Sequence, residues 1–235
     1  MADDPLVLVP GLTCTRDLFA PQIEALAGAR PVTVADHTRD DSLPAIAARL
    51  LARAPERFAL AGLSMGGYVA FEVMRQAPGR VTRLALLNTG ARPDTPDRRE
   101  WREGLIRLAQ QGRFAEVQAE LWPRYVHPDR LDDRDLNARV LRMMADTGPE
   151  TFVRQQRAIM ARPDSRADLP QIEIPVLVLV GAEDASTPPE LAREMAEAIE
   201  WASLVVVPDC GHLSTLERPD AVTRALEAWL VAEAA

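Results

Sequence analysis

The sequence contains no lysine, so all 27 of its basic residues are arginine. Because 35 acidic residues outnumber them, the net charge is −8, which argues against nucleic acid as a partner. The sequence also has no uninterrupted apolar run of about 18 residues, so we expect no membrane-spanning segment and no membrane partner. We attribute the missing lysine to genome composition rather than to function.

Cysteine is also scarce. The chain has 2 cysteines, Cys14 and Cys210, which are too few for a disulfide framework. The first residues, Met1 to Pro5, are acidic and lack the charged-then-apolar layout of a secretory signal. Together these features predict a reduced, cytoplasmic protein.

Short apolar runs rich in valine and leucine alternate with segments of helical periodicity. Because these runs are apolar on both faces, the alternation predicts a single α/β domain whose mostly parallel sheet is flanked by helices on both sides. The six predicted strands are Leu6–Pro10, Pro31–Ala35, Arg57–Ala61, Val81–Leu87, Val176–Val180 and Leu204–Val207. The predicted helices of this core are 17–28, 42–53, 66–77, 188–199 and 219–232.

The alternation stops over residues 92–168, where no strand is predicted. This block is too long for an ordinary loop, so we interpret it as a helical lid (cap) inserted over one end of the sheet. The α/β core then comprises 1–91 and 169–235, and the alternative is a second domain elsewhere on the surface. Prolines separate the four helices expected in the lid, which are 97–111, 114–125, 132–146 and 149–161.

Five residues, Gly62-Leu63-Ser64-Met65-Gly66, stand between a predicted strand and a predicted helix. A serine with glycines two positions before and two positions after it, in this setting, has the nucleophile-elbow pattern. The turn must be tight enough to raise the hydroxyl above the sheet, which leaves little room for side chains at the flanking positions. The pattern predicts that Ser64 is a catalytic nucleophile.

A serine hydroxyl needs a base to act as a nucleophile, and histidine suits this role. Of the 3 histidines, His37 and His212 follow predicted strands, where sites form in open parallel sheets, and His127 lies in the predicted lid. Gly211 precedes His212 and suits a loop that delivers the ring, so we expect His212 to be the base. We expect the other two to be solvated loop residues, with a substrate contact left open for His127.

The acid that orients the histidine is predicted just beyond the strand 176–180. Asp184 follows the carboxyl end of that strand and is our candidate. Glu183 is the main alternative and Asp209 a weaker one, whereas Asp36 follows a strand nearer the sheet edge.

The oxyanion that forms during attack needs N–H donors. We expect one from the backbone of Met65, at the amino end of the helix after the elbow. The other is expected from Leu12, in the loop after the first strand, where Gly11 lets the backbone turn. Cys14 and Cys210 fall near the proposed site loops, and we interpret them as small apolar filler because neither occupies an elbow.

Serine, then acid, then histidine, with an elbow at the serine, resembles the α/β-hydrolase superfamily over nearly the whole chain. The chain looks like the small bacterial lidded serine esterases and the related proline iminopeptidase-like and C–C hydrolase-like enzymes. The resemblance implies Ser64 as nucleophile, His212 as base and Asp184 as acid, with the N–H groups of Leu12 and Met65 as oxyanion hole.

The sequence departs from this family in two ways. Pro10-Gly11 stands where many relatives carry His-Gly ahead of the oxyanion loop. The chain also starts at what the family counts as its third strand. The resemblance therefore implies six strands, all parallel, in the spatial order two-one-three-four-five-six.

The expected activity is hydrolysis of small carboxylic esters through an acyl-enzyme. No metal or organic cofactor is expected, since no dense cluster of histidines and carboxylates occurs in the sequence. The fold also serves C–C bond, amide and thioester hydrolysis, perhydrolysis and acyl transfer, and a ligand-binding receptor without activity is a further alternative. Several lid arginines either form a solvated helix face or attract an anionic substrate: Arg98, Arg99, Arg102, Arg107 and Arg113.

Overall fold

The fold is built on a six-stranded sheet in which neighbouring strands are parallel. The computed structural model describes residues 4–232. Residues 1–3, at the start where no secretory signal is expected, and residues 233–235, the last of the predicted core, lie outside the described range. The strand order β2-β1-β3-β4-β5-β6 confirms the order expected from the family resemblance. The strands are β1 Leu6–Val9, β2 Val32–Val34, β3 Phe58–Leu63, β4 Val81–Leu87, β5 Val176–Gly181 and β6 Ala202–Val207.

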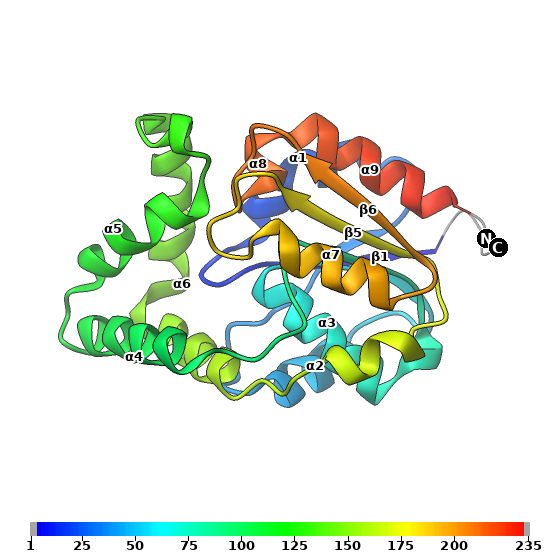
Figure 1. The fold of residues 1–235 in the computed structure, drawn as a ribbon, viewed down its shortest axis with the longest axis horizontal. Helices are drawn as coiled ribbons and strands as arrows, with labels where there is room; N and C mark the ends of the chain where they lie inside the picture. The colour runs from blue at the N-terminus through cyan, green and yellow to red at the C-terminus, as the bar shows by residue number, and fades with distance from the viewer. Residues whose placement is uncertain (1–3, 233–235) are drawn as a thin grey trace.

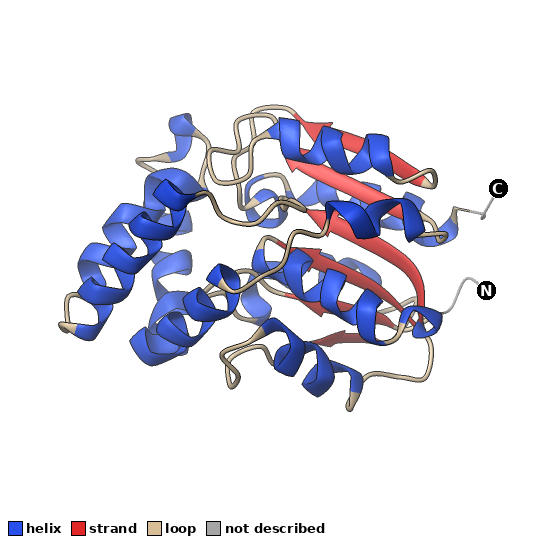
Figure 2. Ribbon diagram, turned by 60° about the horizontal axis from the view of Figure 1, so that its bottom comes forward, coloured by secondary structure: helices blue, strands red, loops and turns tan. Residues whose placement is uncertain are grey.

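Helices cover both faces of the sheet (Figure 2). α2, α3 and α7 lie on one face, and α1 and α9 lie on the other. All of these except α3 have proline in their first turn, where the missing N–H costs no hydrogen bond. Their bounds are α1 Ala20–Leu26, α2 Leu43–Leu51, α3 Met65–Gln76, α7 Pro189–Ala198 and α9 Pro219–Val231, and the sequence analysis missed the short α8, Ser214–Glu217.

The central strands are covered on both faces, as their apolar composition predicted. β1, β3 and β5 are buried along their whole length. The edge strand β6 differs, because its Leu204 and Val206 are 37% and 39% exposed. α7 packs on both β5 and β6, whereas α9 packs on β5. The expectation of strands covered on both sides is therefore wrong for β6, and it is also wrong for the other edge strand, β2, in which Thr33 is exposed.

Between β4 and β5 the chain forms three helices that pack on one another, α4 Pro96–Gln110, α5 Phe114–Tyr125 and α6 Arg134–Met160. We call them the helical insertion. In Figure 1 they lie to the left of the sheet, on the side to which the strand arrowheads point. α6 is interrupted at Gly148, whose φ of 75° is not helical. The sequence predicted a break at this point, between the helices 132–146 and 149–161. No helix within residues 4–232 combines the length and hydropathy that a membrane span requires.

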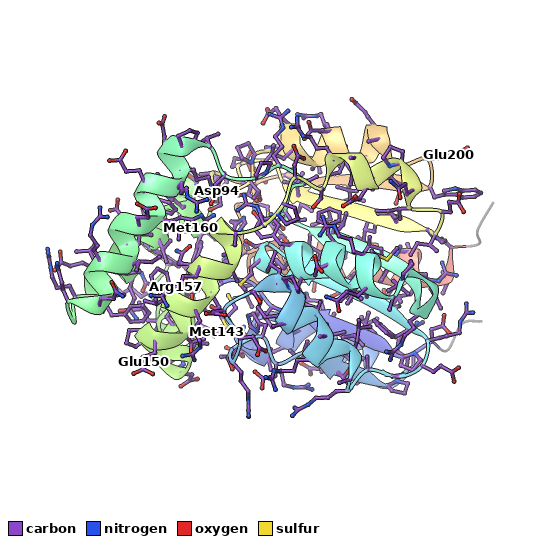
Figure 3. All side chains as sticks on the ribbon, turned by 90° about the horizontal axis from the view of Figure 1, so that it is seen from below. Asp94, Met143, Glu150, Arg157, Met160 and Glu200 are labelled. Atoms are coloured by element: carbon purple, nitrogen blue, oxygen red, sulfur yellow. The ribbon has the colours of Figure 1, made fainter. Side chains whose placement is uncertain are left out.

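A buried ion cluster lies where the helical insertion joins the sheet, around the residue labelled Asp94 in Figure 3. Asp94 accepts hydrogen bonds from Arg102 Nε at 2.8 Å and from Arg162 Nη2 at 2.7 Å, and all three side chains are at most 6% exposed. The interpretation of a solvated helix face is therefore wrong for Arg102, because Asp94 and Gln156 bind its guanidinium inside the protein. Arg113, 51% exposed, does lie on a solvated face.

Candidate active site

The elbow predicted at Ser64 is a tight turn between β3 and α3. Ser64 has a positive φ of 57°, which is strained for a residue other than glycine, and it forms the N-cap of α3. A Cβ on Gly62 would overlap the backbone of Gly66, and a Cβ on Gly66 would overlap the carbonyl of Val9 on β1. Close backbone contact thus requires both glycines. Thr89 also holds the turn, since its hydroxyl donates a 2.8 Å hydrogen bond to Ser64 O.

His212 lies within hydrogen-bond distance of both Ser64 and Asp184. Ser64 Oγ is 2.9 Å from His212 Nε2, and His212 Nδ1 is 2.8 Å from Asp184 Oδ2. The serine and the histidine are 148 positions apart in the sequence and meet because each follows the carboxyl end of a parallel strand. With the hydroxyl donating to Nε2 and Nδ1–H donating to the carboxylate, the histidine can accept the serine proton.

Asp184 is held by hydrogen-bond donors on both of its oxygens. The N–H groups of Ser186 and Thr187 donate to Oδ1 at 2.8 Å each, while the Thr187 hydroxyl and Asn88 Nδ2 donate to Oδ2 at 2.7 and 2.9 Å. Burial acts to raise the pKa of Asp184, but the charge of His212 and these hydrogen bonds outweigh it, so this pKa lies below its ordinary value. The carboxyl is therefore charged at neutral pH and can stabilise an imidazolium.

The alternative acids lie elsewhere. Glu183 Oε2 accepts a 2.9 Å hydrogen bond from the N–H of Cys210, so it braces the histidine loop rather than the imidazole ring. Asp209 is exposed. Asp36 pairs with Arg39 at 2.8 Å, beyond the end of β2.

The other two histidines are less exposed than the sequence suggested. His37 is 2% exposed, and its Nε2 lies 2.9 Å from Gly11 O, so the expectation of a solvated loop residue is wrong for it. Burial lowers the pKa of His37, so the neutral ring donates from Nε2. His127 is half-buried, and its backbone N–H donates to Glu217 Oε2 at 2.7 Å. In the described part of the chain, neither ring is hydrogen-bonded to Ser64.

The backbone N–H groups of Leu12 and Met65 lie on two segments that adjoin Ser64. Met65 is its neighbour in the sequence, and a Cβ on Gly11 would lie 3.5 Å from Ser64 Cβ, which places the loop after β1 against the serine. Among residues 4–232, neither N–H donates to a protein acceptor. Both amides are thus available to a negatively charged oxygen formed at Ser64.

Sequence reasoning missed two residues that shape this site. Tyr125, the last residue of α5, stacks on His212 with ring centroids 5.9 Å apart, and its carbonyl accepts the His212 N–H at 3.1 Å. Asn88, just after β4, donates to Asp184 and to Gly211 O. The position of Asn88 at a strand end was a usable signal, whereas nothing in the sequence pairs Tyr125 with the histidine.

Both cysteines are buried and free. Burial raises the pKa of Cys14 to about 12 and also raises the pKa of Cys210. Protonated thiols are poor nucleophiles, which supports their interpretation as filler. Within residues 4–232, no group of three or more histidine, cysteine, aspartate or glutamate side chains could hold a metal ion.

A model of the alpha/beta hydrolase family matches residues 6–225 of the chain. A pimeloyl-[acyl-carrier protein] methyl ester esterase of Nitrosomonas europaea is 30% identical over 190 residues, which cover 77% of this chain and 74% of the relative. The putative carbamate hydrolase RutD of Azorhizobium caulinodans is 30% identical over 236 residues, which cover 93% of this chain and 88% of the relative.

A solved structure with a similar fold is that of a thermophilic esterase from Thermogutta terrifontis with malate bound. Its TM-score is 0.88 at 31% sequence identity, and the match covers 96% of this chain and 89% of the esterase. Most of the helical insertion and the loops around Ser64 therefore fall within the matched part.

Proposed function

The chain belongs to the alpha/beta hydrolase family of enzymes, and from this premise we propose that it cleaves small carboxylic esters through an acyl-enzyme on Ser64. The observation that carries the proposal is the run of hydrogen bonds from Ser64 Oγ through His212 to Asp184, with distances of 2.9 and 2.8 Å. A serine hydroxyl is a weak nucleophile alone, and this arrangement supplies its base and the acid that orients the base.

In the first half of the proposed reaction, Ser64 Oγ attacks the carbonyl carbon while His212 Nε2 accepts the hydroxyl proton. The N–H groups of Leu12 and Met65 bind the negatively charged oxygen of the tetrahedral intermediate. When the intermediate collapses, the bond to the alkoxy oxygen breaks, and the imidazolium gives its proton to the departing alcohol. Asp184 stabilises the imidazolium while it exists.

In the second half, water attacks the acyl carbon and gives a proton to His212 Nε2. The bond between the acyl carbon and Ser64 Oγ then breaks, the proton returns to Oγ and the carboxylic acid leaves. One ester and one water become one acid and one alcohol, so the cycle needs neither a metal nor an organic cofactor.

We further propose that residues 92–168 act as a lid over the core formed by 1–91 and 169–235. The stacking of Tyr125 on His212 supports this role, because it places part of the helical insertion against the proposed base. Several apolar side chains of the insertion are at most 2% exposed: Leu105, Val117, Leu121, Val140, Met143, Met144 and Phe152.

We propose small esters as the substrates because the chain is similar to a methyl ester esterase and to an esterase of known structure, in addition to having the hydrogen bonds that join Ser64, His212 and Asp184. The same three side chains could also cleave carbamates, the bond named for another relative, as well as amides, thioesters or C–C bonds, and they could serve perhydrolysis or acyl transfer. The cytoplasmic location remains a prediction, which the free thiols of Cys14 and Cys210 support.

The proposal is tested by hydrolysis of p-nitrophenyl acetate by the wild type, Ser64→Ala and Ser203→Ala. Ser203 is an exposed serine on β6 and gives a matched control. We expect Ser64→Ala to lose activity by about 1,000-fold or more and the control to stay within about twofold of wild type. Equal rates for Ser64→Ala and wild type would show that the assignment is wrong.

A panel of substrates then tests which class of bond the enzyme cleaves. Esters, thioesters, amides, carbamates and vinylogous diketones are compared by kcat/KM on the wild-type enzyme. We expect the highest value for a small ester. A higher value for another class, still abolished by Ser64→Ala, would overturn the ester assignment and leave the role of Ser64 intact.

A further inference from the structure

The loop that carries the Leu12 N–H is held by α6 of the helical insertion. We propose that Gln155 is a positioning residue that fixes this loop in the geometry needed to bind the oxyanion. The inference rests on the proposed function, and it assigns a catalytic consequence to a residue whose hydrogen bonds reach neither Ser64 nor His212.

Gln155 forms two hydrogen bonds with the core from a fully buried position. Its Oε1 accepts the N–H of Thr13 at 2.8 Å, across 142 positions of sequence, and its Nε2 donates to His37 O at 3.3 Å. One side chain thus joins the loop after β1 to the loop after β2. Both of its polar atoms are satisfied, as a buried amide requires.

Thr13 needs such a partner because its backbone is strained. Its φ is 56°, in a region that β-branched residues rarely occupy, and its side chain is fully buried. A strained conformation persists only where its surroundings hold it in place. The Leu12–Thr13 peptide shares the Cα of Leu12 with the Gly11–Leu12 peptide, which carries the Leu12 N–H, so holding the first restricts the second.

His37 braces the same loop from its other side. Its Nε2 donates to Gly11 O at 2.9 Å, while its own carbonyl accepts from Gln155. Gly11 and Thr13, the two neighbours of Leu12, are therefore both tied to the Gln155–His37 pair. His37 lies three residues beyond β2, so its contact with Gly11 joins the loop after β2 directly to the oxyanion loop.

The break in α6 adds a second contact with Thr13. Thr147, just before Gly148, places its Oγ1 3.4 Å from Thr13 O, although the carbonyl of Met144 in the same helix is a closer acceptor for this hydroxyl, at 3.0 Å. Gln155 binds Thr13 N from the segment after the break. Arg154 strengthens the attachment, because its guanidinium donates to Thr38 O at 3.0 Å. The geometry of the oxyanion loop therefore depends on the helical insertion as well as on the core.

The test compares Gln155→Leu with Gln156→Leu. Both glutamines are fully buried neighbours on α6, but Gln156 accepts from Arg102 and makes no contact with the oxyanion loop among the described hydrogen bonds. The first readout is kcat and KM on the best ester. The second is the rate constant for labelling Ser64 with a fluorophosphonate, whose phosphoryl oxygen occupies the same oxyanion site. The third is the affinity of a trifluoromethyl ketone, which forms a tetrahedral adduct.

We expect Gln155→Leu to lower kcat and the labelling rate by about 10-fold to 100-fold, with KM within about threefold of wild type. The affinity of the ketone should fall by the same factor as kcat/KM, because both report on the oxyanion. Gln156→Leu should keep kcat and labelling within about threefold of wild type. Equal losses in the two variants, or a loss confined to KM, would overturn the proposal.

A second variant covers the case in which Gln155→Leu does not fold. Gln155→Glu keeps the shape of the side chain and the acceptor for Thr13 N–H, but it replaces the amide group that donates to His37 O with a carboxylate oxygen. We therefore expect the rate constant for labelling of Ser64 to fall by about threefold or more. Labelling at the wild-type rate would overturn the proposal. Failure of the proposed function is separable, because an enzyme that hydrolyses no ester but labels at Ser64 still reports on the oxyanion loop.

Discussion

The side-chain amide of Asn88 donates a 2.9 Å hydrogen bond to Asp184 Oδ2, although 96 positions separate the two residues in the sequence. The same amide donates to Gly211 O at 3.2 Å, and Asn88 Oδ1 accepts from the hydroxyl of Ser214. One fully buried side chain at the end of β4 thus joins the acid loop to the histidine loop.

Replacement of Asn88 by alanine should therefore affect stability and catalysis together. Asn88→Ala removes a donor to a buried carboxylate and places alanine at a φ of 45°. We expect the free energy of unfolding to fall by about 2 kcal/mol or more and kcat to fall by about tenfold. Urea unfolding and ester kinetics measure both. Asn137→Ala, at a half-buried site on α6, is the control, and a similar loss there would contradict this account.

The elbow should not tolerate a methyl group at Gly66. Its added Cβ would overlap Val9 O, so Gly66→Ala must move β1 or α3, and we expect loss of activity and a fall in unfolding free energy of about 2 kcal/mol or more. Gly28→Ala meets no atom within 4 Å and should change stability by less than about 1 kcal/mol. Thermal unfolding measures both, and an active, stable Gly66→Ala enzyme would be inconsistent with the geometry.

The ion cluster at Asp94 should contribute strongly to stability. Asp94→Ala would leave the buried guanidinium groups of Arg102 and Arg162 without their shared carboxylate, and breaking such a pair costs about 3–5 kcal/mol. The exposed Asp97→Ala, in the first turn of α4, should cost no more than about 1 kcal/mol. Urea unfolding distinguishes the two. Equal costs would mean that the cluster contributes little.

Glu217 should make the protein less stable as pH rises. One of its oxygens accepts the His127 N–H, the other has no partner among residues 4–232, and burial raises the pKa of this carboxyl. A raised folded-state pKa means that the folded protein holds this proton when the unfolded chain has lost it. Stability from this group is therefore complete below the unfolded value of about 4.3 and is lost as pH rises through the folded pKa.

The variant Glu217→Gln removes this titration. We expect the difference in unfolding free energy between variant and wild type to shift in favour of the variant from about pH 5 to about pH 8. Urea midpoints across that range measure it. Parallel curves for the two proteins would contradict the prediction.

The residues that follow strands could be predicted from the sequence. Ser64, His212 and Asp184 each follow an apolar run of the sequence, and parallel strands bring such positions to one edge of a sheet. The strand order followed from the family resemblance. These steps depend on local patterns, which one sequence displays.

The supporting contacts could not be predicted in this way. Gln155 is a neutral side chain on a helix, and its partner Thr13 lies 142 positions away, so no local pattern links them. Arg102 looked like one charge of a solvated face because its partner Asp94 lies outside the helical repeat. The exposure of Leu204 follows from where α9 packs, which the composition of β6 does not reveal.

The most direct test of the account is detection of the acyl-enzyme. The enzyme is mixed with a p-nitrophenyl ester, quenched in acid within the first turnover and digested, and the peptide containing Ser64 is analysed by mass spectrometry. We predict a mass increase of one acyl group on Ser64, formed together with a burst of p-nitrophenol and absent in Ser64→Ala. Turnover with no acyl group on Ser64, or with the acyl group on another residue, would contradict the account.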